Sequence, residues 1–294
     1  MRTIKTYILA LFVTAVTVFA VNASQIEQHQ IKIDGHSVYY NTAGKGDKVI
    51  LFLHGLFADK EQWTQLMEFF SDKGYYTVAL DLPGFGKSEG YPLNVYTINN
   101  QVILLKEFIE KAGLKNINLA GNSFGCAIAI AFTEKYKNNV KTLALLGGPA
   151  GLGKWSPELM EAYKNGINPF IPVTEKEFNT EMELLFYHPP VISEKTIKNI
   201  VENYKNNLNK YTKIFNLFNL TIYNFTVNFN ISFKKPTLIV WGKNDKIYSV
   251  DGAKEAQKKI PESKLEILDN AGHLLMIEKA KETAGIYYKF LNKR

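Results

Sequence analysis

The first half of the chain alternates between two patterns of hydrophobic and polar positions. Short runs that are almost wholly apolar are typical of strands buried on both faces of a sheet. The segments between these runs carry apolar residues at helical spacing instead. The runs occupy residues 49–53, 75–80, 117–120 and 140–146, and the helical segments occupy 61–71, 96–112 and 124–136. Because strands and helices alternate, we predict an α/β fold with a mostly parallel sheet covered by helices.

A different pattern precedes the first buried strand. Apolar residues at 31–33 and 38–40 flank the dipeptide Asp34-Gly35. Asp-Gly between two short apolar segments is a strong signal for a tight hairpin turn. We therefore predict that a β-hairpin begins the folded domain.

The alternation stops at Trp155 and resumes after about residue 232. Thr174 and Glu177 have the spacing of a helix capping box, and the apolar positions within residues 197–218 form one long helical stripe. No strand pattern interrupts this region, which is also rich in aromatic residues. Strand and helix patterns then return, at residues 237–241, 250–259, 265–268 and 274–291.

This organisation predicts one sheet domain that is interrupted by an inserted helical cap. We place the first half of the core at residues 24–154, the cap or lid at 155–232 and the second half of the core at 233–294. The closing segments then add further strands to the same sheet and further helices that cover it.

Residues 1–23 have the features of a targeting segment. Arg2 and Lys5 precede an apolar stretch at 7–21, and small residues end the segment before Ser24. This pattern favours a cleaved signal peptide and an exported protein, either periplasmic or secreted. The alternative is an uncleaved membrane anchor, although the stretch is shorter than the roughly 20 residues that a spanning helix needs.

Composition excludes several classes of protein. Of the 294 residues, 46% are hydrophobic and 21% are charged, which is typical of a globular chain and not of a disordered one. The net charge of +7 is spread without a basic block, so we expect no nucleic-acid partner. The single cysteine, Cys126, excludes a disulfide scaffold and a cysteine-based zinc site. We interpret it as a buried small apolar residue.

The strongest chemical signal is Gly121-Asn-Ser123-Phe-Gly125, between a predicted strand and a predicted helix. This G-x-S-x-G pattern in this context indicates a turn that lifts a nucleophilic serine above the sheet. The turn is tight, so side chains at Gly121 and Gly125 would collide with their surroundings. We predict that Ser123 is the nucleophile and adopts a strained backbone conformation.

A serine hydroxyl needs a base, and the base needs an orienting carboxylate. Asp245 and His273 each follow a predicted strand, so they lie at the same edge of the sheet as Ser123. We predict His273 as the base and Asp245 as its partner. Asp251 and Asp269 are rival carboxylates, but the first fits a helix start and the second fits a turn.

The loop after the first buried strand supplies a second set of candidates. His54 and Gly55 end that strand, and we expect His54 to make a structural hydrogen bond that shapes the loop. A tetrahedral intermediate needs hydrogen-bond donors for its negatively charged oxygen. We predict the backbone N–H groups of Leu56 and Phe124 as this oxyanion hole.

These motifs together resemble the α/β-hydrolase superfamily, including monoacylglycerol-lipase-like proteins and related bacterial lipases and esterases. The resemblance rests on His54-Gly55, Asp81-x-x-Gly84-x-Gly86-x-Ser88, Gly121-x-Ser123-x-Gly125, Asp245, Gly272-His273, and the stretches 53–63 and 148–151. It implies the same roles for Ser123, Asp245 and His273, and it implies no metal and no organic cofactor. Cys126 departs from the pattern, because many relatives have a glycine there.

The leading functional hypothesis is hydrolysis of a carboxylic ester of a lipid-like or other apolar acyl group through an acyl-enzyme intermediate. The same triad serves carbon–carbon bond hydrolases, iminopeptidases and cofactor-free haloperoxidases, and a non-catalytic ligand-binding protein is a further alternative. The N-terminal segment and the cap are the candidate contacts with a membrane or lipid surface.

The iminopeptidase hypothesis depends on acidic residues in the cap that would hold a substrate amine. We interpret the cap glutamates instead as a solvated helix face balanced by lysines. They are Glu158, Glu161, Glu175, Glu177, Glu181, Glu183, Glu194 and Glu202.

Overall fold

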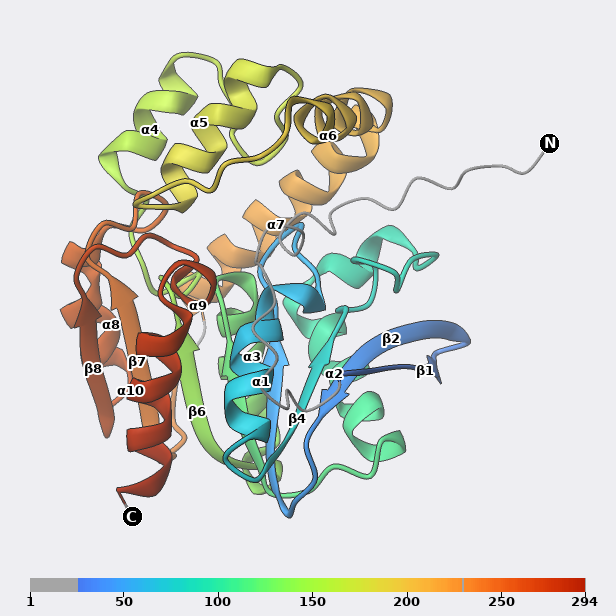
Figure 1. Ribbon diagram of the computed structural model, residues 1–294, viewed down its shortest axis with the longest axis vertical. Coiled ribbons are helices and arrows are strands. Elements are labelled where there is room, and N and C mark those ends of the chain that lie inside the picture. Colours follow the sequence, from blue (N-terminus) through green and yellow to red (C-terminus); the bar gives the residue numbers. More distant parts are fainter. Residues whose placement is uncertain (1–25, 229, 294) are drawn as a thin grey trace.

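The computed structural model describes residues 26–228 and 230–293, so the predicted targeting segment at 1–23 lies outside the described residues. Within them, one sheet of eight strands forms the centre of the molecule, in the order β1-β2-β4-β3-β5-β6-β7-β8 (Figure 1). The strands are β1 (Glu27–Ile33), β2 (His36–Ala43), β3 (Lys48–Leu53), β4 (Tyr75–Leu80), β5 (Ile117–Gly121), β6 (Val140–Leu146), β7 (Thr237–Gly242) and β8 (Ser263–Leu268).

The sheet is parallel from β4 to β8, and β1 and β2 add an antiparallel edge. The predicted hairpin is confirmed: β1 pairs with β2, with Ile33 opposite His36. Asp34 and Gly35 both have positive φ angles, of 48° and 77°. Positive φ at both central residues matches the right-handed twist of the paired strands, which is why Asp-Gly suits this turn.

Helices cover both faces of the sheet. Helices α1 and α10 pack together on one face, and α2 and α3 pack together on the other (Figure 1). The core helices are α1 (Thr64–Ser71), α2 (Ile98–Lys111), α3 (Phe124–Lys135), α8 (Ala253–Lys259), α9 (Leu275–Glu278) and α10 (Ala280–Asn292). The predicted alternation of strands and helices is therefore confirmed. Sequence periodicity predicted one helix over 274–291, but α9 ends before Lys279, whose φ of −130° interrupts the helix.

In the described part of the chain, four helices lie between β6 and β7, where the sequence predicts the cap. They are α4 (Pro157–Lys164), α5 (Glu175–Leu185), α6 (Glu194–Asn206) and α7 (Leu208–Asn228). Figure 1 shows α4, α5 and α6 above one end of the sheet, with α7 descending from them towards the core. The capping box is present, because Thr174 and Glu177 each bond the other's backbone N–H. Among the described residues, no helix is both long and apolar enough to cross a membrane.

The long apolar stripe in this region is divided between two helices. Asn207 ends α6 with non-helical angles of φ −118° and ψ 19°. Its side-chain amide donates to the backbone oxygen and to the side-chain oxygen of Asn203, both at 3.0 Å. Asparagine side chains compete in this way with the helical hydrogen bonds of the backbone. The apolar periodicity continues across Asn207, so it did not reveal the break.

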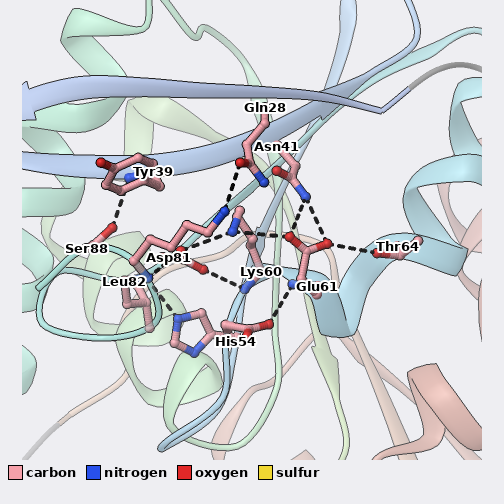
Figure 2. A network of polar contacts seen from close by, with 12 residues as sticks. Gln28, Tyr39, Asn41, His54, Lys60, Glu61, Thr64, Asp81, Leu82 and Ser88 are labelled. Carbon is pink, nitrogen blue, oxygen red and sulfur yellow. Dashed lines mark hydrogen bonds and ion pairs between the residues drawn. The ribbon is translucent and has the colours of Figure 1, made fainter. Parts of the chain in front are cut away.

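A buried ion pair supports the loop that follows β3. Lys60 and Asp81 have side chains that are 2% and 0% exposed, and Lys60 Nζ lies 3.1 Å from Asp81 Oδ2 (Figure 2). Asp81 also accepts hydrogen bonds from the backbone N–H groups of Lys60 and Lys87, both at 2.9 Å. Burial lowers the pKa of Lys60, but Asp81 and Glu61 raise it more, so this lysine stays charged. The pair joins the loop after β3 to the turn after β4.

We expect the Lys60→Met substitution to lower the free energy of unfolding by about 3 kcal/mol or more, because it leaves the buried Asp81 carboxylate without its cation. Urea unfolding followed by circular dichroism measures this loss. Lys243→Met is the matched control. It breaks an ion pair with Asp269 whose side chains are 61% and 72% exposed, so its effect should be much smaller than that of Lys60→Met. Equal effects of the two substitutions would contradict the prediction.

Candidate active site

Ser123 occupies the tight turn between β5 and α3. It is the N-cap of α3 and has φ 51° and ψ −112°, a conformation that L-residues rarely adopt. The two flanking glycines are required by close contacts. A Cβ at Gly121 would lie 2.5 Å from the Gly125 carbonyl carbon, and a Cβ at Gly125 would lie 2.2 Å from the Leu53 oxygen. The turn therefore has the strained geometry that the motif predicts.

Cys126 lies directly behind this turn and is fully buried. Its thiol donates to the Gly121 oxygen at 3.1 Å, and burial raises its pKa. A buried, protonated thiol is a poor nucleophile. The side chain therefore fills space between helix and strand, in agreement with its interpretation as a small apolar residue.

Asp245 and His273 form a buried pair at the ends of β7 and β8. Asp245 Oδ2 accepts a hydrogen bond from His273 Nδ1 at 2.8 Å, and both side chains are at most 4% exposed. Backbone N–H groups hold the carboxylate in place: Gly148 donates to Oδ2 at 3.2 Å, and Ile247 and Tyr248 donate to Oδ1 at 2.8 and 3.0 Å. Because the carboxylate only accepts, Nδ1 carries the proton and Nε2 is left as an acceptor.

The rival carboxylates lie away from His273. Asp269 is exposed and forms an ion pair with Lys243 at 2.7 Å. Asp251 is exposed in a short 3-10 turn before α8. The structure thus brings Asp245 to the histidine and leaves these two acids at the surface.

His54 is buried and plays a structural part. Its Nε2 accepts a hydrogen bond from the Leu82 N–H at 2.9 Å, so Nδ1 carries the proton and donates to the Gly55 oxygen at 2.8 Å. Burial lowers the pKa of the ring to about 4, which keeps it neutral. The structure therefore shows the loop-shaping hydrogen bond that the sequence predicts.

A cavity opens onto both Ser123 and His273. Its walls are mostly apolar and come from the loop after β3, from α5 and α6, and from the segment after β8. The apolar lining comprises Leu56, Phe57, Ala58, Phe170, Phe178, Met182, Leu185, Ile192, Ile200 and Leu274. The polar lining comprises Gln62, Asn122, Ser123, Glu181, Tyr204 and His273.

The two candidate oxyanion donors differ in position. Leu56 lines the cavity, whereas the Phe124 ring is buried and contacts Phe85 and Phe218, which leaves only the backbone of Phe124 available to a substrate. Over residues 26–228 and 230–293, neither the Leu56 N–H nor the Phe124 N–H has a hydrogen-bond acceptor.

Phe57, the residue that follows Leu56, has a φ of 55°. Its ring meets Tyr204 and Tyr211 of the cap edge to face.

Glu278 is a positioning residue that sequence reasoning missed. Its carboxylate accepts hydrogen bonds from the backbone N–H of Gly272 at 2.8 Å, and from those of Tyr187 and His188 at 3.1 and 2.5 Å. It thereby joins the loop of His273 to the segment that follows α5. The His273 N–H itself donates to the Leu185 oxygen at 2.8 Å. No sequence pattern marks such long-range contacts.

The site offers no arrangement suited to a metal ion. Within the part of the chain that the structure describes, no group of three or more histidine, cysteine, aspartate or glutamate side chains could hold one. The arrangement offers serine, histidine and carboxylate groups, backbone N–H donors without acceptors among the described residues, and an apolar cavity.

Comparisons with known proteins agree with the fold described above. A family model described as the alpha/beta hydrolase fold matches residues 48–280. Monoacylglycerol lipase ABHD6 of Bos taurus is 30% identical over 253 residues, which cover 82% of this chain and 74% of that protein. Lipase 3 of Moraxella sp. (strain TA144) is 27% identical over 294 residues, which cover 94% of this chain and 92% of that protein.

A solved structure extends the similarity to three dimensions. The crystal structure of a membrane phospholipase A, described as a bacterial virulence factor, has a TM-score of 0.79 and 26% sequence identity, and the match covers 91% of this chain and 86% of that one. The resemblance deduced from the motifs is thus confirmed, and the chain belongs to the alpha/beta hydrolase fold family.

Proposed function

We propose that this protein hydrolyses carboxylic esters of lipids through a serine acyl-enzyme. The observation that carries the proposal is the buried Asp245–His273 pair, which opens with Ser123 onto one apolar cavity. Relatives named as lipases and as a monoacylglycerol lipase support the class of reaction.

The geometry supports a definite course for the reaction. Ser123 Oγ attacks the ester carbonyl carbon, and His273 Nε2 accepts the hydroxyl proton. Asp245 holds the ring in the required tautomer and stabilises its positive charge. The Leu56 and Phe124 N–H groups stabilise the negative charge on the carbonyl oxygen. His273 then gives the proton to the leaving alcohol, and water releases the acid from Ser123 in a second, equivalent cycle.

The cavity supports an apolar acyl group as substrate. Phe178, Met182 and Leu185 of α5 and Ile200 of α6 lie in its wall, close to the reacting groups. Burying each methylene of an acyl chain against such side chains contributes about 0.8 kcal/mol. Among the residues that the structure describes, no lysine or arginine lines the cavity, so an anionic substrate has no cation among them to bind.

We also propose that the segment at 1–23 exports the protein, because a positive start, an apolar stretch and small residues occur in that order. Contact with a lipid surface through the cap is supported by the exposed apolar side chains of Leu220, Tyr223 and Val227 on α7. Both proposals are compatible with a substrate that resides in or near a membrane.

The Ser123→Ala substitution should abolish hydrolysis of a medium-chain nitrophenyl ester, because no other group on the cavity wall can form the acyl-enzyme. Intact-protein mass spectrometry after treatment with a fluorophosphonate should show one added phosphonyl group in the wild-type protein and none in the variant. Hydrolysis that persists in the variant would refute Ser123 as the nucleophile.

The Asp245→Asn substitution should lower kcat by about 10³-fold to 10⁴-fold, since an amide facing Nδ1 no longer holds the ring in the productive tautomer. Asp251→Asn and Asp269→Asn are controls that should keep wild-type kcat. Thermal unfolding of all three variants checks that the fold is intact. A loss in either control that equals the loss in Asp245→Asn would show that the acid is misassigned.

A further inference from the structure

Phe57 lies in a tight turn that carries one of the proposed oxyanion donors. The Ala58 N–H donates to the Gly55 oxygen at 3.3 Å, which closes a four-residue turn with Leu56 and Phe57 at its centre. Phe57 has a φ of 55°. A positive φ at the third residue of a turn is normally adopted by glycine or asparagine, because a bulky side chain is strained there. This chain therefore has a phenylalanine where the backbone conformation disfavours one.

Ring contacts from the core and from the cap hold Phe57 in this conformation. Its ring meets Tyr211 of α7 edge to face, with 5.2 Å between the ring centroids, and Tyr204 of α6 at 6.4 Å. Phe85, in the turn after β4, packs against it from the core at 6.5 Å. Edge-to-face pairs are attractive beyond the apolar area that they bury. A strained backbone conformation persists where surrounding contacts fix it in this way.

The same aromatic contacts extend to the residue of the second proposed oxyanion donor. The Phe85 ring also meets the Phe124 ring at 6.2 Å, and Phe218 of α7 packs on Phe124 at 5.4 Å. Phe124 begins α3, so the helix itself fixes the direction of its N–H. The Leu56 N–H lies outside any helix or strand, in the turn that Phe57 completes. Of the two donors, the one at Leu56 therefore depends more on these ring contacts.

The backbone conformation at Phe57 decides how the Leu56 donor is presented. Turns with negative and with positive φ at the third residue differ by reversal of the peptide group between the second and third residues. Here that peptide group joins Leu56 to Phe57, so its reversal would turn the Leu56 carbonyl over and displace the adjoining Leu56 N–H. Oxyanion donors act because they are already in place when charge develops, and a small displacement lowers the rate.

We propose that Phe57 is a positioning residue that keeps the Leu56 N–H directed at the substrate oxygen. Tyr204 and Tyr211 of the cap act through its ring, with Phe85 as the support on the core side. The proposal rests on the ester hydrolysis proposed above. It gives the cap a part in stabilising the transition state, besides its part in lining the cavity.

The Phe57→Ala substitution should lower kcat for a soluble short-chain nitrophenyl ester by about 10-fold to 100-fold, a part of what the loss of a whole oxyanion donor costs. KM should change by less than about 3-fold, because the donor acts on charge that develops only in the transition state. Phe57→Tyr keeps the ring and should preserve kcat within about 3-fold.

Phe69→Ala is the matched control. Phe69 of α1 is also a partly buried phenylalanine, and its ring meets Phe70 and Tyr288 edge to face. Its removal should lower the temperature of thermal unfolding, as the removal of Phe57 does, but should leave kcat unchanged.

A second pair of variants tests the contribution of the cap. Tyr211→Ala should lower kcat with little change in KM, whereas Tyr211→Phe, which keeps the ring, should preserve kcat. The double variant of Phe57→Ala with Tyr211→Ala should lose no more than Phe57→Ala alone, because the cap ring acts through Phe57. Losses that add in the double variant would overturn the proposal, since Tyr211 would then act by another route.

An alkylboronic acid reports on the oxyanion hole without turnover. A bond forms between boron and Ser123 Oγ while His273 takes the hydroxyl proton, and the tetrahedral adduct is negatively charged like the transition state. Phe57→Ala should weaken this inhibitor by the factor by which it lowers kcat/KM. An alkyl ether of equal chain length forms no adduct, so isothermal titration calorimetry should find its dissociation constant within about 3-fold of the wild-type value.

The outcomes separate the positioning role from the reaction on which it rests. Unchanged kcat and unchanged boronic acid affinity in Phe57→Ala would overturn the positioning role while ester hydrolysis stands. Equal weakening of the boronic acid and the ether, or an equal loss of kcat in Phe69→Ala, would also overturn it, because either result indicates a general loss of packing. A wild-type protein that neither hydrolyses the ester nor binds the boronic acid through Ser123 would refute the reaction, and the positioning role with it.

Discussion

The close approach of the turn after β5 to the end of β3 is the constraint on which the site depends. Gly125 lies so near the Leu53 oxygen that any side chain there would collide with it, and Gly121 is equally confined by Gly125. The backbone between these two glycines is tightly confined, and within it Ser123 adopts a positive φ at the start of α3. The same contact places the loop of Gly55 and Leu56 beside the serine, so the proposed nucleophile and the proposed oxyanion donor share one support.

The parallel sheet extends this local constraint to the rest of the triad. Strands β3, β5, β7 and β8 run in the same direction, so their carboxyl ends meet at one edge (Figure 1). Ser123, Asp245 and His273 follow three of these strands, which explains why the sequence alone could place all three at one edge of the sheet. The glycine-bracketed turn and the buried strands are local sequence patterns. Such patterns predict the folded structure well, because a strand buried on both faces must be apolar along its whole length.

Contacts that depend on the packing of distant segments could not be predicted. At the break, the Asn207 side-chain amide donates back to Asn203 and the backbone leaves the helical angles, while the apolar period continues unchanged. The role of Glu278 is visible only once residues 187 and 272 lie side by side. Glu181 is an intermediate case, because its helical spacing was readable but its charge favoured the solvent side of the helix. Charge alone is therefore a poor guide to which face of a cap helix meets a cavity.

Helix α5 connects the cavity wall to His273, the proposed base. Its apolar face and Glu181 form part of the cavity wall, and its last residue, Leu185, accepts the hydrogen bond of the His273 backbone. Glu278 then joins the following segment to Gly272 on the other side of that histidine. The cap thus supports His273, the proposed base, as well as covering the cavity. A displacement of α5 would move the cavity wall and the support of His273 together, so the shape of the cavity and the orientation of this histidine are coupled through one helix.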